Sequence, residues 1–136
     1  MSETVALLRR ARSRYHWVGI YLIENNDLVL GPFVGKPTPH TRIPLNQGIC
    51  GAAASSGRAL IVDDVNADPR YLACSLETRS EIVVPIVHNG QVLGEIDIDS
   101  DLPAAFSAQD LALLEEVALI LAEKLSIRGV DDRKAL

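Results

Sequence analysis

Cysteine is scarce in this sequence, which has only Cys50 and Cys74 among its 136 residues. Two cysteines are too few for the disulfide framework of a small secreted domain, so they fit a reducing compartment in which thiols stay free. No apolar run reaches the roughly 18 residues that a membrane-spanning helix needs, and no signal peptide is expected ahead of the domain. These absences lead us to expect a soluble cytoplasmic protein that does not engage a membrane.

Positive charge is also in short supply, because the net charge at neutral pH is −5. The sequence has no basic stripe of the kind that follows a nucleic-acid backbone. One basic cluster lies at residues 9–14, inside an expected helix, where it is most simply a solvated helix face. We therefore predict that nucleic acid is not a partner.

Hydrophobic residues make up 48% of the chain, enough for one continuous core in a protein of this length. We expect a single domain over residues 1–128 and a polar C-terminal tail over residues 129–136. The residue pattern predicts three helices and five strands in the order α-β-β-α-β-β-β-α. The helices are expected at 2–15, 49–56 and 107–127, and the strands at 17–24, 28–34, 59–62, 81–87 and 91–99.

Three segments between or within these elements carry further information. Prolines should keep residues 35–45 irregular, because each one removes a donor and biases its predecessor towards extended geometry. Residues 63–78 form a connection that is long for a small domain, and such loops are often functional. The last helix is apolar on two faces, which predicts two partners: the sheet, and either the first helix or a second chain.

The hairpin formed by the last two strands offers two registers. A two-residue turn at residues 89–90 would mix apolar and acidic side chains on one face of the sheet. A three-residue loop, with Val87 opposite Gln91, makes one face wholly apolar, and we predict this register because a single slip exchanges the faces. The apolar face then holds Ile82, Val84, Ile86, Val92, Gly94, Ile96 and Ile98.

The same register brings three acidic residues together on the other face. Glu81, Asp97 and Asp99 share it, with Glu81 expected directly opposite Asp97. One interpretation is the solvent-exposed side of a half-buried hairpin. The other is a carboxylate cluster that lines a cavity, where close like charges raise at least one pKa and keep a proton available.

The two cysteines have different settings. Cys50 falls at the start of the expected short helix, where the helix dipole would stabilise a thiolate, although a buried inert cysteine is the simpler interpretation. Cys74 lies in the long loop, shortly before Arg79, and a loop cysteine near a cation is a better candidate nucleophile. With His40 the cysteines show neither Cys-x-x-Cys nor paired-histidine spacing, so the sequence predicts no metal site.

Trp17 and Tyr21 lie four residues apart on the first expected strand, so their side chains point to the same side of the sheet. Both are most simply core residues. They could also form the wall of a pocket for a small apolar group.

Several blocks of this sequence resemble the free methionine-(R)-sulfoxide reductases, enzymes built on a GAF domain. The resemblance runs from residue 17 to the end of the last strand. The blocks are WVGIYL (17–22), LVLGPF (28–33), GICG (48–51), AC (73–74), RSEIVVP (79–85) and GEIDIDS (94–100). The resemblance implies an α+β GAF fold: a six-stranded antiparallel sheet with the terminal helices on one face and the short helix and loops over a pocket on the other. It also implies a homodimer.

The resemblance implies a mechanism as well. Cys74 matches the family's catalytic cysteine, whose thiolate would attack the sulfoxide sulfur of free methionine-(R)-sulfoxide and become a sulfenic acid. Glu81, Asp97 and Asp99 match its substrate-binding acids: one gives a proton to the departing oxygen, and an ionised neighbour holds the ammonium group. Trp17 and Tyr21 match the aromatic wall around the methyl-sulfur end of the substrate. No cofactor is implied beyond an external thiol reductant, either a small thiol or a thioredoxin-like protein.

The sequence departs from the family pattern at His40, where a third cysteine usually serves as the resolving thiol. Three outcomes follow for the sulfenic acid at Cys74. Cys50 resolves it, an external thiol attacks it directly, or turnover is lost and the pocket is kept for sensing. The acid cluster favours retained chemistry, since clustered buried carboxylates are costly in a cavity that is not used.

Two alternatives from other functional classes fit the same fold. One is a GAF module that senses a small molecule and signals through its terminal helices. The other is a dimerisation module without pocket chemistry, for which a buried, inert Cys74 would be the distinguishing observation. A cyclic-nucleotide pocket is disfavoured, because the sequence has no signature of that GAF subclass.

Overall fold

The computed structural model describes residues 1–72 and 76–134, and the side chains of residues 1–72 and 76–127. The helices are α1 (Ser2–Ala11), α2 (Gly48–Ser56), the short 3₁₀ helix η1 (Val65–Ala67) and α3 (Ala108–Lys134). The strands are β1 (Trp17–Glu24), β2 (Asp27–Val34), β3 (Arg42–Pro44), β4 (Leu60–Val62), β5 (Ser80–His88) and β6 (Gln91–Ser100).

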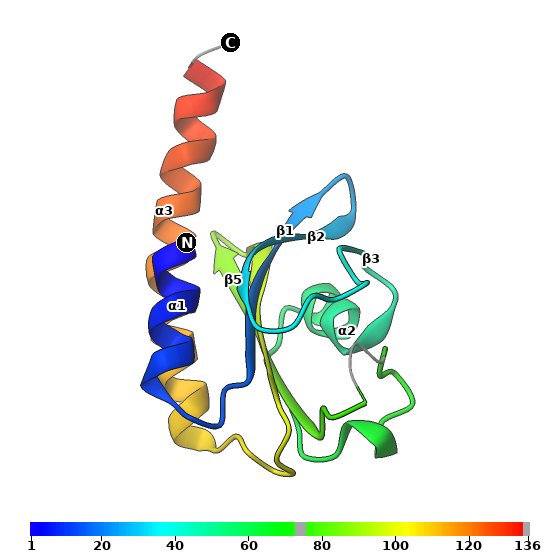
Figure 1. Ribbon diagram of the computed structural model, residues 1–136. Helices are drawn as coiled ribbons and strands as arrows, with labels where there is room; N and C mark the ends of the chain where they lie inside the picture. Colours follow the sequence, from blue (N-terminus) through cyan, green and yellow to red (C-terminus); the bar gives the residue numbers. More distant parts are fainter. Residues whose placement is uncertain (73–75, 135–136) are drawn as a thin grey trace.

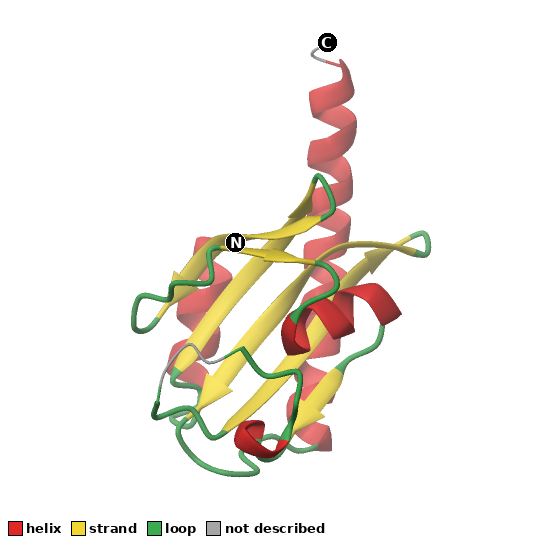
Figure 2. Ribbon diagram, turned by 90° about the vertical axis from the view of Figure 1, so that its right-hand side faces the viewer, coloured by secondary structure: helices red, strands yellow, loops and turns green. Residues whose placement is uncertain are grey.

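The strands form one six-stranded sheet in the order β3-β2-β1-β6-β5-β4, with every neighbouring pair antiparallel. Helices α1 and α3 cover one face of this sheet, and α2 and the long connections cover the other (Figure 1). In Figure 2 the short helices α2 and η1 lie in front of the sheet, and the terminal helices α1 and α3 lie behind it. The predicted α+β architecture, including the placement of helices on the two faces, is confirmed.

Each face of the sheet has its own hydrophobic core. The core on the α1 and α3 side takes Ile82, Val84 and Ile86 from β5 and Ile96 and Ile98 from β6, and Ile82 and Ile98 are fully buried. The core on the α2 side is smaller and contains Trp17, Tyr21 and Cys50. This second core also borders the buried acids, so the two faces differ in chemistry as well as in packing.

Local sequence accounts for most element boundaries. α2 ends before Gly57, its C-cap, which adopts the left-handed conformation (φ 67°) that favours glycine at a helix C-terminus. At the start of α3, the Asp110 carboxylate accepts hydrogen bonds from the Ser107 backbone N–H and hydroxyl, which caps the helix. The sixth strand, β3, lies within the proline-containing stretch expected to be irregular. It pairs with β2 as an edge strand, a position that tolerates Pro44 because no further strand needs its missing N–H. Only the central residue of β3, Ile43, is buried.

The β5–β6 hairpin has the two-residue turn, so the predicted three-residue loop is wrong. Asn89 and Gly90 both have positive φ (51° and 77°), and His88 pairs with Gln91. A bulge at Leu93 then inserts one extra residue into β6, which restores the apolar face beyond it. The turn and the bulge together shift the pairing of Glu81 by two residues along β6, so Glu81 lies opposite Asp99 and not Asp97. Val92 packs on the α2 side.

Helix α3 continues to Lys134 rather than ending at Ile127, so it enters the stretch expected to be a polar tail. Helix α1 is shorter than predicted and ends at Ala11. Among the residues that the structure describes, no helix combines the length and apolar character needed to cross a bilayer.

Candidate active site

Four acidic side chains lie buried on the α2 side of the sheet. Glu95, Asp97 and Asp99 alternate along β6, and Glu81 on β5 lies directly opposite Asp99. None of the four is more than 4% exposed. The sequence prediction that Glu81, Asp97 and Asp99 share one face is therefore correct, and the fold adds Glu95 to them.

The buried position of the four acids disfavours negative charge on each of them. Burial is the main cause that raises the pKa of each carboxyl above its usual range, and repulsion from Asp97 adds to the pKa of Glu81, Glu95 and Asp99. None of the ion pairs formed among the described residues includes any of the four acids. The cluster therefore holds protons at a pH where ordinary carboxylic acids have lost them.

Two aromatic side chains of β1 border the acids. Trp17 pairs with Asp99 across the β1–β6 ladder, and Tyr21 pairs with Glu95. The indole N–H donates to the Lys36 carbonyl at 3.0 Å, and the Tyr21 hydroxyl donates to the His40 carbonyl at 2.8 Å. Both rings are thereby tied to the segment between β2 and β3.

A glycine between the two aromatic residues makes room for the indole. A Cβ built on Gly19 would lie 2.2 Å from the Trp17 ring, which is closer than any real contact. The indole therefore lies across the backbone of its own strand, stacked on Phe33 with 5.7 Å between ring centroids. Only glycine at this position allows Trp17 to lie flat beside the acids.

Cys50 approaches the acids from the opposite layer. It lies in the first turn of α2, and its Sγ is 3.3 Å from Asp97 Oδ2 and 3.9 Å from Glu81 Oε2. Burial and the neighbouring carboxyls raise the pKa of the Cys50 thiol well above its usual range. The stabilisation of a thiolate expected from the helix N-terminus is thus outweighed, and the thiol is neutral at neutral pH.

Cys74 lies outside the described residues. The described residues on its two sides border the site. Leu72 lines a cavity with Cys50, and Thr78 lines a second cavity with Asp99. The described residues Leu72 and Thr78, on either side of Cys74 in the sequence, therefore both lie beside the acid cluster.

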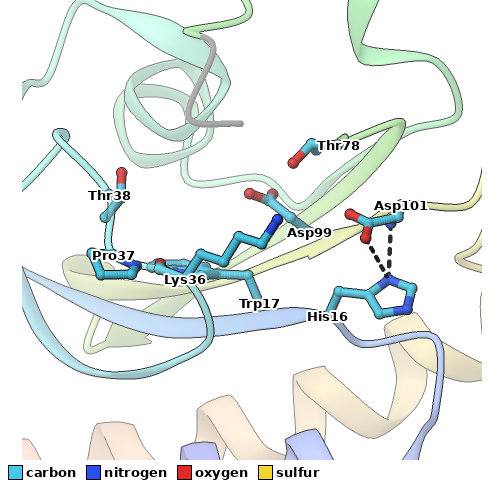
Figure 3. A pocket seen from close by; sticks show the side chains of 8 residues that line it. All are labelled: His16, Trp17, Lys36, Pro37, Thr38, Thr78, Asp99 and Asp101. Carbon is cyan, nitrogen blue, oxygen red and sulfur yellow. Dashed lines mark hydrogen bonds and ion pairs between the residues drawn. The ribbon is translucent and has the colours of Figure 1, made fainter. Parts of the chain in front are cut away.

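Two cavities reach the cluster from different sides. One, with a volume of about 70 Å³, is lined by Trp17, Asp99 and polar residues, and the Lys36 side chain extends towards Asp99 in it (Figure 3). The other has a volume of about 20 Å³ and is lined by Cys50, Glu81 and Asp97 among others. His40, at the position where the family usually has its third cysteine, also lines this smaller cavity.

Glu95 is the site residue that sequence reasoning missed. Its side chain is fully buried, and neither carboxyl oxygen has a hydrogen-bond partner in the described part of the chain. The alternation Glu95-Ile96-Asp97-Ile98-Asp99 was the available signal, because every second residue of a strand faces the same way.

Comparison with known proteins gives consistent results. The GAF domain family matches residues 2–125. The free methionine-R-sulfoxide reductase of Escherichia coli (strain K12) is 36% identical over 126 residues, which are 93% of this chain and 76% of the relative.

Solved structures extend the similarity to three dimensions. A type II free methionine-R-sulfoxide reductase from Thermoplasma acidophilum has a TM-score of 0.89 at 42% identity. The match covers 90% of this chain and 87% of the Thermoplasma chain. The free methionine-R-sulfoxide reductase from Neisseria meningitidis, solved in complex with its substrate, has a TM-score of 0.87 at 40% identity. The match covers 99% of this chain and 78% of the Neisseria chain. This chain therefore belongs to the GAF domain family and, within it, to the family of the free methionine-R-sulfoxide reductases.

Proposed function

We propose that this chain reduces free methionine-(R)-sulfoxide to methionine, with Cys74 as the nucleophile. The observation that carries the proposal is the buried acid cluster beside Trp17. Its raised pKa values supply the proton that sulfoxide reduction consumes. The family of the chain supports the substrate, since the relatives named above carry this activity in their names.

The chemical step balances as follows. The Cys74 thiolate attacks the sulfoxide sulfur while a protonated carboxyl gives its proton to the oxygen. The oxygen, now a hydroxyl, is transferred from the substrate sulfur to the cysteine sulfur, so the substrate sulfur–oxygen bond and the transient sulfur–sulfur bond both break. The substrate sulfur gains two electrons and the cysteine sulfur loses two. The products are methionine and a sulfenic acid on Cys74.

The positions of the acids support a different proposed task for each. Asp99 lines the larger cavity next to Trp17, so it is the proposed proton donor to a sulfoxide bound against the indole. Glu81 lies opposite Asp99 and completes the donor pair. Asp97 shares the cluster, and an ionised member of it would hold the substrate ammonium group. Trp17 and Tyr21 would enclose the methyl-sulfur end.

Resolution of the sulfenic acid needs a second thiol. Because the Cys50 thiol is neutral and buried, direct attack by an external thiol is the better supported route. Attack by a thiol R–SH on the sulfenic acid releases water and forms a mixed disulfide with Cys74. A second thiol then releases Cys74 as a free thiol and forms an external disulfide. A thioredoxin-like protein or a small thiol would act as this reductant, with no other cofactor.

Two further expectations concern the oligomeric state of the enzyme and its location in the cell. A homodimer is favoured by exposed apolar side chains on α3, where Leu119, Ile120 and Ile127 are all more than half exposed. A cytoplasmic location fits an enzyme that depends on thiol reductants.

Turnover of free methionine-(R)-sulfoxide with dithiothreitol as reductant tests this proposal. We expect methionine from the wild-type chain, none from Cys74→Ser, and a retained rate from Cys50→Ser if the thiol attacks directly. Loss of turnover in Cys50→Ser would instead make Cys50 the resolving thiol. No methionine from the wild type, even with excess reductant, would refute the enzyme and leave the sensing module as the interpretation.

A further inference from the structure

The α-carboxylate of the proposed substrate needs a binding partner of its own. Free methionine-(R)-sulfoxide carries an ammonium group, a carboxylate and a sulfoxide, and the acid cluster serves the first and the last of these. A further negative charge is disfavoured beside four buried carboxyls, so the carboxylate has to bind at the edge of a cavity, next to a positive charge. In a peptide an uncharged amide replaces this carboxylate. The group that binds it therefore also decides between a free amino acid and a peptide.

Lys36 places such a charge at the larger cavity. It lines this cavity together with Trp17 and Asp99, and its side chain extends towards Asp99 (Figure 3). Among the described residues that line either of the two cavities, it alone carries a permanent positive charge. Its side chain is 72% exposed. The charge therefore lies beside the proposed proton donor, where the site meets solvent.

Two local features hold the Lys36 backbone beside Trp17. Gly35 has a φ of 136°, which other residues rarely adopt, and a Cβ built on it would lie 2.6 Å from the indole ring. The indole N–H donates to the Lys36 carbonyl oxygen at 3.0 Å. A ligand that packs on the indole therefore lies beside the lysine side chain.

The Lys36 ammonium group already contacts a carboxylate. Its Nζ lies 3.2 Å from Glu77 Oε2, and both side chains are more than half exposed. Exposed ion pairs of this kind contribute little to stability, so one carboxylate can replace another. Thr78, the next residue after Glu77, lines the cavity, so the ion pair marks a place at the cavity edge where a carboxylate meets Lys36. A substrate carboxylate would take this place while Glu77 turns to solvent.

We propose that Lys36 binds the α-carboxylate of free methionine-(R)-sulfoxide at the edge of the larger cavity and makes the site specific for the free amino acid. The inference rests on the proposed function, because it concerns the same substrate. Lys36 contacts a part of the substrate that does not react, so it acts on binding and specificity and not on proton transfer. Peptide-bound methionine sulfoxide has no charge at this position and would leave the Lys36 site unused.

Ligand binding without turnover tests the role of Lys36 directly. Cys74→Ser removes the proposed nucleophile. Trp17 is the only tryptophan of the chain and lines the cavity, so its fluorescence reports binding. The ligands are L-methionine-(R)-sulfoxide and its α-amide, compared at about pH 6, where both keep the charge of the ammonium group. They differ only at the carboxylate.

Three variants in the Cys74→Ser background separate charge from packing. We expect Cys74→Ser itself to bind the free acid at least about tenfold more tightly than the amide, as one charge-assisted hydrogen bond would give. Lys36→Met should lower this preference to about twofold or less by weakening the binding of the acid alone, and Lys36→Arg should keep most of it. Lys124→Met is the matched control. Lys124 is exposed on α3, at the opposite face of the sheet, and its replacement should leave both affinities unchanged.

Three results would overturn the role of Lys36. They are equal binding of acid and amide by Cys74→Ser, a preference for the acid that survives Lys36→Met, and no binding of either ligand.

Turnover of the chain with Cys74 intact decides the reductase separately. Lys36→Met should raise KM for the free acid at least about tenfold and leave kcat within about threefold of the wild type. Turnover with a KM that does not respond to Lys36→Met leaves the reductase standing and contradicts the carboxylate site. Binding of the acid through Lys36 by a protein that forms no methionine refutes the reductase and supports the carboxylate site.

Discussion

Replacing Glu95 by methionine should stabilise this protein at neutral pH. Glu95 is fully buried and neither of its carboxyl oxygens has a hydrogen-bond partner in the described part of the chain. A buried polar group without a partner destabilises the folded state by about 1–3 kcal/mol, and methionine has an unbranched side chain of similar length without polar oxygens. We therefore expect Glu95→Met to raise the free energy of unfolding by about 1–3 kcal/mol, or the melting temperature by about 3–5 °C for each kcal/mol.

The stabilisation should also depend on pH. Burial, followed by repulsion from Asp97, raises the pKa of Glu95 in the folded protein well above that in the unfolded chain. A group of this kind contributes stability that is present below its unfolded pKa and is lost as the pH rises through its folded pKa. The wild type therefore loses stability relative to the variant above about pH 4.3, by up to about 1.36 kcal/mol per pH unit.

Urea unfolding at several pH values between 4 and 8 measures both effects. Glu24→Met is the matched control, because Glu24 is exposed on the neighbouring strand β1 and its replacement should change stability by no more than about 0.5 kcal/mol. A variant that is less stable than the wild type, or a difference that does not grow with pH, would refute the reasoning. Glu95 would then be satisfied by a partner in solution.

Three further predictions follow from other parts of the structure. Asp110→Asn weakens the acceptor for the Tyr15 hydroxyl and for the N-terminus of α3, so it should lower the free energy of unfolding by about 2–4 kcal/mol in urea denaturation. Gly94→Ala places a Cβ 2.2 Å from the Tyr21 carbonyl oxygen and must separate two central strands. It should lower the melting temperature strongly, and an unchanged value would contradict the close approach of the strands. Asp99→Asn should lower the turnover of free methionine-(R)-sulfoxide by about 10²–10⁴-fold with an unchanged circular dichroism spectrum. An unaffected rate would exclude Asp99 as the proton donor.

The arrangement of acids on one face of the sheet could be predicted because strand periodicity is local. Alternation along residues 94–99 assigns each side chain to a face without any knowledge of the partner strand. The pairing partner depends on the turn and on bulges, which is why Glu81 was placed opposite Asp97 and lies opposite Asp99. The bulge at Leu93 has only an ambiguous signal in the sequence, because a glycine inside a strand, here Gly94, indicates either a bulge or the close approach of another backbone.

The position of Cys50 could not be derived from the sequence for a different reason. Its two carboxyl neighbours are 31 and 47 residues away along the chain, and they meet it only when α2 packs on the sheet. From the sequence, the helix N-terminus would favour a thiolate at Cys50, while a buried, inert cysteine was the simpler interpretation. Burial among the carboxyls reverses the sign of that effect, and only the tertiary structure shows it.

The most direct test of the proposed function is a single turnover without reductant. Wild-type protein in its reduced form would be mixed with one equivalent of free methionine-(R)-sulfoxide, and methionine would be quantified together with the oxidation state of each cysteine by mass spectrometry. We predict about one methionine per chain and one added oxygen atom, or its dimedone adduct, on the peptide that contains Cys74. Methionine formation without modification of Cys74, or no methionine at all, would contradict the proposed role of this cysteine.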